Sequence, residues 1–176
     1  MEKKKTADIL DACCGGKMFY FNKDDERVLF QDIREIETTL CDGREFNVKP
    51  DVVGDFRSME FGDETFSMVI FDPPHLLRNK EESTFESIYI DKDKEPTGWQ
   101  QIKYGAIGNQ DWKETIKQGF SECFRVLKPN GFLIFKWNET NIGVSEILKL
   151  TPYKPILGHK SGKKSNTHWI LFQKNV

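Results

Sequence analysis

A chain of 176 residues, 38% of them hydrophobic and 31% charged, has the length of one ordinary domain and the composition of a soluble globular protein. The net charge of -2 gives no global nucleic-acid footprint, so a local patch would have to hold any such partner. No apolar stretch approaches the length of a membrane span, and the N-terminus has no apolar signal region, which predicts a cytoplasmic protein. The four cysteines have no zinc-site spacing, which favours reduced thiols.

Short apolar runs that end in turn residues predict a series of strands. They lie at 7–12, 27–31, 51–54, 66–71 and 132–135, with a last strand at 168–172. Helices are predicted at 17–22, 111–127 and 141–150. Strands that alternate with helices indicate an α/β fold, a Rossmann-like three-layer sandwich. We expect one domain, 1–176, with a mostly parallel sheet and an antiparallel hairpin at one edge.

The regular pattern is lost between about residues 76 and 110. This segment is polar, carries mixed charge and contains several aromatic residues. A structureless segment of that length inside a compact domain is usually functional or disordered. We interpret it as a lid or a substrate-recognition insert; the alternative is a surface excursion with its own small cluster.

Asp72-Pro73-Pro74-His75 follows an apolar run that reads as a buried strand. Proline lacks an N–H group and fixes φ, so the strand must end there and present the acid in a stiff loop. The carboxyl ends of strands are where ligands bind in open α/β sheets. Such a loop suits an uncharged amine, whose hydrogen bonds the acid would accept while the ring of His75 stacks nearby. The plainer alternatives are that Asp72 only caps the next segment and that His75 packs or faces solvent.

Three more acids, Asp11, Asp32 and Asp55, close predicted strands and would share one rim of the sheet with Asp72. A glycine turn at 15–16 follows the first strand, and an acid about 20 residues beyond it is placed to bind a ribose diol. Four carboxylates would repel a polyphosphate and suit a cation or a neutral polar ligand. They point to S-adenosylmethionine, which carries a sulfonium and an ammonium. A metal ion bound by the same rim is the rival interpretation.

Over residues 8–172 the chain resembles the class I S-adenosylmethionine-dependent methyltransferases. Residues 11–16, Asp-Ala-Cys-Cys-Gly-Gly, are similar to their Asp-x-x-x-Gly-x-Gly loop, with Lys17 in place of the last glycine. Residues 53–56, Val-Gly-Asp-Phe, resemble the family's third motif, and 72–75 resemble the Asp/Asn-Pro-Pro-aromatic signature of the amino-methyltransferases. The whole set looks most like the small forms found in phage and prophage genomes.

The resemblance assigns two sets of residues. It implies that the cofactor is bound by Asp11, Ala12, Cys13, Cys14, Gly15, Lys17, Asp32, Ile33, Asp55 and Phe56. It implies that Asp55 meets the adenine amine and that Phe56 packs near the ring, while Lys17 reaches the cofactor carboxylate or faces solvent. Catalysis would fall to Asp72, Pro73, Pro74 and His75. Asp72 and the carbonyl of Pro73 would accept the amine's hydrogen bonds and direct its lone pair at the methyl group.

Candidate substrate contacts lie in two further places. Lys160, Lys163 and Lys164 belong to a basic, glycine-rich stretch that could grip phosphates or form a solvated hairpin end. Lys136 and Trp137 follow the fifth strand on the rim of Asp72, where Trp137 would stack on a base or pack in the core.

These assignments favour methylation of an exocyclic amine of adenine or cytosine, with nucleic acid as partner and DNA favoured over RNA. The alternatives are a methyltransferase that acts on RNA, protein or a small molecule, and a binding module without turnover. The sequence predicts no metal and leaves the oligomeric state open.

Overall fold

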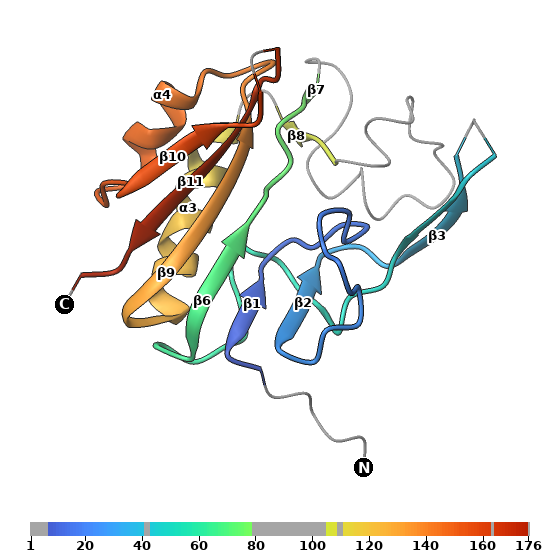
Figure 1. Ribbon diagram of the computed structural model, residues 1–176, viewed down its shortest axis with the longest axis horizontal. Helices are drawn as coiled ribbons and strands as arrows, with labels where there is room; N and C mark the ends of the chain where they lie inside the picture. Colours follow the sequence, from blue (N-terminus) through green and yellow to red (C-terminus); the bar gives the residue numbers. More distant parts are fainter. Residues whose placement is uncertain (1–6, 41–42, 79–104, 109–110, 163, 176) are drawn as a thin grey trace.

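The computed structural model describes residues 7–40, 43–78, 105–108, 111–162 and 164–175. Its centre is a seven-stranded sheet in the order β10-β11-β9-β6-β1-β2-β5 (Figure 1). The strands are β1 (Ile9–Asp11), β2 (Val28–Asp32), β5 (Val52–Val53), β6 (Phe66–Phe71), β9 (Leu127–Asn138), β10 (Leu157–Lys160) and β11 (Thr167–Gln173). Strands β5, β2, β1, β6 and β9 pair in parallel, and β11 pairs antiparallel with both β9 and β10. The mostly parallel sheet with an antiparallel edge hairpin is therefore confirmed.

The register of the central strands brings their carboxyl ends to one edge. Asp11, the last residue of β1, pairs with Phe30 in β2 and with Ile70 in β6. Strands β2 and β6 are apolar over most of their length, as expected for parallel strands that are covered on both faces. The segments that follow β1, β2 and β6 therefore begin side by side.

Helix α3 (Trp112–Val126) covers one face of the sheet and lies behind it in Figure 1. Its buried residues recur at helical spacing, and the ring of Phe120 packs 5.6 Å from Phe71 and 4.8 Å from Phe135 between centroids. Gly119 allows this approach, because a Cβ there would lie 2.5 Å from the Phe71 ring. The predicted helix at 141–150 is shorter: α4 (Val144–Ile147) continues as the 3-10 helix η1 (Leu148–Leu150) on the same face.

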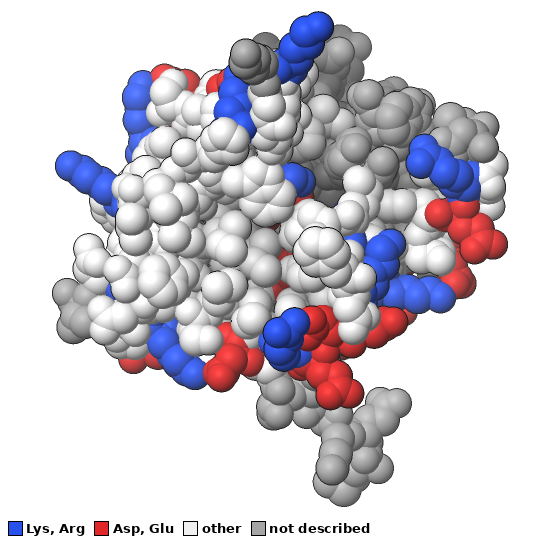
Figure 2. Space-filling model, in the orientation of Figure 1, with Lys and Arg blue, Asp and Glu red and all other residues white. Residues whose placement is uncertain are grey.

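The other face is covered by turns where the sequence predicted a helix at 17–22. Lys17 has φ +52°, which interrupts a helix at its first residue. The rings that follow pack on the sheet instead, Tyr20 at 4.9 Å from Phe30 and Phe19 at 5.3 Å from Trp169 between centroids. Much of the face turned to the viewer in Figure 2 is uncharged, with the charged side chains gathered mainly at its margins.

Two small sheets lie outside the main one. Strands β3 (Ile36–Thr39) and β4 (Glu45–Val48) form an antiparallel hairpin with its own small core, an element that the sequence pattern did not reveal. Strands β7 (Leu77–Arg78) and β8 (Ile107–Gly108) pair in parallel and bring together the two described ends of the insert at 76–110. Residues 79–104 and 109–110 lie outside the described part, so the lid interpretation stays a prediction. No described helix is long and apolar enough to cross a membrane.

Candidate functional site

A cleft of about 650 Å³, counting the part open to solvent, lies at the carboxyl ends of β1, β2 and β6. Its walls come from three successive loops, residues 13–16 after β1, 32–34 at the end of β2 and 72–75 after β6. Met18 and Phe19 from the turn after β1, Phe56 after β5 and Lys136 from β9 complete it. The parallel strands thus bring together segments that are far apart in sequence, at the edge where such sheets bind ligands.

Most of the residues assigned from the sequence meet in this cleft. Those that line it are Cys13, Cys14, Gly15, Asp32, Ile33, Phe56, Asp72, Pro73, Pro74, His75 and Lys136. Asp11 is fully buried at the end of β1 and does not line the cleft itself.

Asp11 fixes the loop that follows β1. Its carboxylate accepts hydrogen bonds from the Tyr20 hydroxyl at 2.7 Å and from the Cys13 N–H at 3.2 Å. Burial, with a smaller contribution from the carboxylates of Asp72 and Asp32, raises the pKa of Asp11 to about 7, although the two hydrogen bonds oppose the shift. Asp11 therefore carries a proton for part of the time near neutral pH.

Asp32 is almost fully buried and is paired with Arg34. Its Oδ1 accepts the Arg34 backbone N–H and Nε, both at 2.9 Å. Its Oδ2 accepts the Gly15 N–H at 2.8 Å and a terminal guanidinium nitrogen of Arg34 at 3.3 Å. Asp32 thus ties the glycine turn to the end of β2. Gly15 has φ +50°, a conformation that favours glycine.

Asp55 does not line the cleft, in contrast to the role implied by the resemblance. Its carboxylate is paired with Arg57, which donates from Nε and from a terminal nitrogen at 2.9 and 2.6 Å to Oδ2. The neighbouring Phe56 does line the cleft and packs 5.2 Å from Phe71 between centroids. The apolar wall predicted at this strand end is present, whereas the carboxylate is turned to its own arginine.

Asp72 forms an ion pair with Lys136, in which Lys136 Nζ donates to Asp72 Oδ2. Both side chains are about four-fifths buried. Burial raises the pKa of Asp72, and Lys136 opposes that shift. The Lys136 ammonium also lies 5.2 Å from the Phe19 ring and 5.6 Å from the Trp169 ring. The acid of the double-proline loop is therefore a largely buried acceptor whose present donor is a lysine.

His75 is a neutral ring at the cleft wall. Burial and the nearby Lys136 lower its pKa to about 4, so the imidazole carries no charge at neutral pH. Its ring lies edge-on to Trp137, 6.4 Å between centroids. A neutral imidazole in this place can pack against a flat ligand or exchange one hydrogen bond with it.

Besides Asp11 and Asp55, two further residues assigned to the cofactor do not line the cleft. Ala12 is buried, and its carbonyl accepts a hydrogen bond from Gln31 Nε2 at 3.2 Å. Lys17 is buried as well: its ammonium donates to the Lys23 carbonyl at 3.1 Å and lies 4.0 Å from the Phe30 ring. Lys17 therefore holds the turn at 17–23 together, and neither of the two roles expected for it applies.

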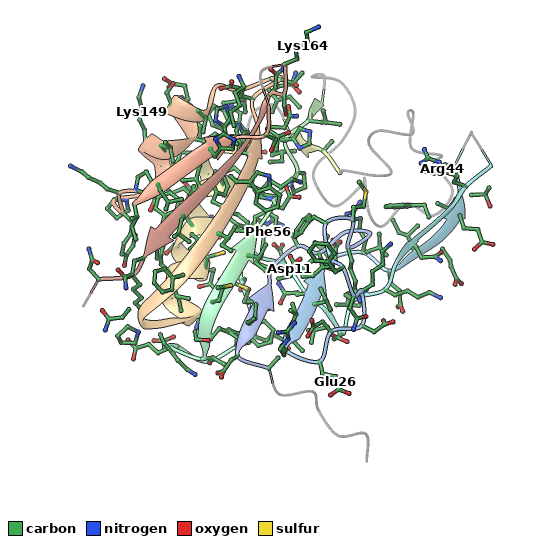
Figure 3. The ribbon with its side chains drawn as sticks, in the orientation of Figure 1. Asp11, Glu26, Arg44, Phe56, Lys149 and Lys164 are labelled. Carbon is green, nitrogen blue, oxygen red and sulfur yellow. The ribbon has the colours of Figure 1, made fainter. Side chains whose placement is uncertain are left out.

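The expected substrate contacts other than Lys136 lie outside the cleft or outside the described residues. Trp137 is fully buried and donates from Nε1 to the Ile142 carbonyl at 2.9 Å, so it is a core residue and cannot stack on a base. Lys160 is paired with Glu139 at 2.8 Å. Lys164 extends from the end of the β10–β11 hairpin and does not line the cleft (Figure 3). Lys163 lies outside the described residues.

Sequence reasoning missed Met18, Phe19 and Arg34 as cleft residues, and it placed Gly16 in the glycine turn without assigning it a contact. Arg34 had a local signal, because an arginine two positions after an acid can fold back onto it, as its hydrogen bonds do here. Met18 and Phe19 had none, since they lie in the segment predicted as a helix.

Neither the thiols nor the acids near the cleft form a metal site. Burial raises the pKa of the Cys13 and Cys14 thiols, so both stay protonated at neutral pH. Within the described ranges, no group of three or more histidines, cysteines and acids is placed to hold a metal ion.

No protein-family model and no curated protein matches the chain. Solved structures do share its fold. A Pyrococcus horikoshii protein matches at TM-score 0.53 and 21% identity, over 99% of this chain and 84% of its own. A Methanosarcina mazei S-adenosylmethionine-dependent methyltransferase matches at 0.54 and 12%, over 98% and 94%. A Burkholderia thailandensis 1,6-didemethyltoxoflavin-N1-methyltransferase, solved with 1,6-didemethyltoxoflavin and S-adenosylhomocysteine, matches at 0.50 and 11%, over 96% and 71%. At these identities the likeness establishes the Rossmann-like fold.

Proposed function

We propose that this protein is an S-adenosylmethionine-dependent methyltransferase that methylates an exocyclic amine, most favourably that of adenine or cytosine in DNA. One observation carries the proposal: the glycine turn after β1 and the Asp72–His75 loop after β6 line the same cleft. Two of the three fold neighbours described above are named as methyltransferases, and one of them was solved with S-adenosylhomocysteine, the demethylated cofactor.

The cleft offers contacts for both the ribose and the adenine of a nucleoside cofactor. Asp32 and the Gly15 turn would hold the ribose, and Phe56 with Ile33 gives an apolar wall for the adenine. The loops at 13–16 and 72–75 would lie along the methionine part. The cofactor supplies an electrophilic methyl group on a sulfonium.

Catalysis in this proposal consists of holding the acceptor amine. Asp72 accepts one of its N–H hydrogen bonds and the carbonyl of Pro73 the other, which directs the nitrogen lone pair into the cleft. Lys136 donates to Asp72 Oδ2, so the amine either uses the remaining acceptor positions of the carboxylate or displaces the ammonium. The proton that leaves the amine passes to Asp72, whose pKa is raised by burial, or to water.

A small heterocyclic amine is the second candidate acceptor. The observation in its favour is the Burkholderia neighbour, whose name and bound ligand describe a small-molecule acceptor. In DNA, the target base would first have to leave the helical stack to reach Asp72. The two candidates make different demands on the surface around the cleft, since only DNA brings phosphates that must be neutralised.

The test incubates the purified protein with cofactor that carries a radiolabelled methyl group, in separate reactions with DNA, RNA, protein and small heterocyclic amines. We expect label in DNA, and we expect Asp72→Ala to lose transfer by roughly 10²-fold or more. The variant should still bind S-adenosylhomocysteine in titration calorimetry. Glu26→Ala, an exposed acid at the opposite edge of the sheet, is the matched control (Figure 3).

Each outcome decides one part of the proposal. Label in a different acceptor pool would keep the methyltransferase and replace its substrate. Binding of S-adenosylhomocysteine without label in any pool would favour a binding module. Absence of binding would refute the cofactor assignment.

A further inference from the structure

Three Asp-x-Arg segments among the described residues fold in the same way. They are residues 25–27, 32–34 and 55–57. In each, the backbone N–H and Nε of the arginine donate to Oδ1 of the acid two positions earlier, and a terminal guanidinium nitrogen donates to Oδ2. The pattern is a local clamp that needs no third residue. Its surroundings decide whether it has a further role.

The clamp at 32–34 differs from that at 25–27 in its burial and its place. The Arg34 and Asp32 side chains are 6% and 3% exposed, whereas Arg27 is 82% exposed. Arg34 and Asp32 also line the cleft, at the strand end where a ribose would be held. In this clamp, Arg34 therefore occupies the carboxylate that the proposed function assigns to the ribose hydroxyls.

The carboxylate of Asp32 is saturated. Four donors reach it, the N–H of Gly15 and three groups of Arg34, and a carboxylate offers about four lone-pair sites. The two backbone N–H groups are fixed by the fold. The guanidinium alone can leave by side-chain rotation, and it borders the open space of the cleft.

We propose that Arg34 is a latch on Asp32: its guanidinium holds the acceptor positions that the hydroxyl pair of a nucleoside ligand takes, and ligand entry displaces it. The inference rests on the proposed function, because it assigns the diol to Asp32. A ligand then gains the Asp32 hydrogen bonds only after the buried ion pair is broken. Arg34 lowers the affinity for the ligand and selects against molecules that cannot replace its hydrogen bonds.

The latch predicts that removal of the Arg34 side chain strengthens ligand binding, whereas the loss of a cleft side chain usually weakens it. In Arg34→Met or Arg34→Gln, Asp32 keeps two backbone donors and has free acceptor sites before any ligand arrives. The ligand no longer competes with a guanidinium. We expect the Kd for S-adenosylhomocysteine to fall about tenfold, which corresponds to about 1.4 kcal/mol.

The experiment is titration calorimetry of S-adenosylhomocysteine with the full chain and its variants. Arg27→Met is the matched control, because it opens the same clamp at an exposed position outside the cleft and should leave the Kd unchanged. Adenosine and 2′,3′-dideoxyadenosine are the second pair of probes. The gain in Arg34→Met should appear with adenosine and be absent with the dideoxy compound.

The outcomes separate the latch from the cofactor assignment. If the wild type binds S-adenosylhomocysteine and both Arg34 variants bind it with equal or lower affinity, the latch is overturned and the cofactor assignment stands. A gain that is as large for the dideoxy probe also overturns it. No binding to any form refutes the proposed cofactor and the latch with it. Circular dichroism checks the fold, and if Arg34→Met unfolds, Arg34→Gln decides, because it removes the charge but keeps a polar side chain.

Discussion

Replacement of Lys136 by methionine tests how the acid of the double-proline loop is held. Lys136→Met removes the ammonium that donates to Asp72 and keeps an unbranched apolar side chain beside the Phe19 and Trp169 rings. Removal of one partner from a fully buried pair costs about 3–5 kcal/mol, because the other charge stays buried without compensation. Here each side chain keeps about a fifth of its exposure. We therefore expect the free energy of unfolding at neutral pH to fall by about 2 kcal/mol.

The loss should depend on pH with a defined sign. Lys136 lowers the pKa of Asp72 against the upward effect of burial, so the variant has an Asp72 pKa above that of the wild type. A carboxyl with a folded-state pKa above its unfolded value of about 3.8 binds protons preferentially in the folded state. Its contribution to stability then declines as pH rises through that window. The deficit of Lys136→Met should be largest near neutral pH and shrink as pH falls towards 4.

Urea denaturation of wild type and variant at about pH 7 and about pH 5 measures both effects. Lys149→Met is the control, because Lys149 is paired with Glu146 on the exposed surface, where such pairs contribute about 0–1 kcal/mol (Figure 3). A deficit in Lys136→Met no larger than in the control, or one that is the same at both pH values, would refute the account of this ion pair.

Three further substitutions test the packing and the protonation of the site. Gly119→Ala should lower the free energy of unfolding by about 1–3 kcal/mol in thermal denaturation, because its Cβ would overlap the Phe71 ring; an unchanged Tm would contradict that close approach. Trp137→Phe should cost about 1–2 kcal/mol through its lost buried hydrogen bond and leave S-adenosylhomocysteine affinity in calorimetry unchanged, whereas a large loss of affinity would argue against a core role. Asp11→Asn should be more stable than wild type near pH 8, by up to about 4 kcal/mol, and lose that advantage towards pH 4, because the folded pKa of Asp11 lies at about 7 against 3.8; a difference that does not vary with pH in urea titrations would refute it.

The sequence located the cleft because its walls depend on strand ends. The apolar runs that became β2 and β6 stop abruptly at Asp32 and before Asp72, and parallel strands bring such ends to one edge. No long-range information was needed for that step. The loops at 13–15, 32–33 and 72–75 do line one cleft, while the roles assigned to them stay predictions.

The face of the sheet to which a side chain points was harder to predict than its position along the strand. Trp137 follows Lys136 directly, and successive residues of a strand point to opposite faces, so both cannot face the cleft. In β9, residues 133, 135 and 137 are buried while 132, 134 and 136 are partly exposed, an alternation that places Trp137 in the core. The signal was present in the sequence, but it needed knowledge of which face α3 covers.

The segment at 17–22 was misjudged because tertiary contacts overrode its local pattern. The Tyr20 hydroxyl bonds to Asp11, and Lys17 adopts a positive φ while its ammonium binds the Lys23 carbonyl. These contacts join the turn to the sheet and replace the hydrogen bonds that a helix would make. A pattern of spacing cannot reveal them, because each depends on where β1 and β2 place their ends.

The charges of the cleft change the electrostatic argument that the sequence suggested. Four acids at neighbouring strand ends appeared to favour a cationic ligand, yet Asp32, Asp55 and Asp72 are each paired with a cation, and Asp11 has a pKa near neutrality. Such pairs leave little net field to attract a sulfonium or a metal ion. Recognition must then come from directional hydrogen bonds to these carboxylates, whose acceptor positions become available when the paired cation moves away. The affinity of this cleft should accordingly depend more on how easily Arg34 and Lys136 are displaced than on ionic strength, since buried pairs are screened little by salt.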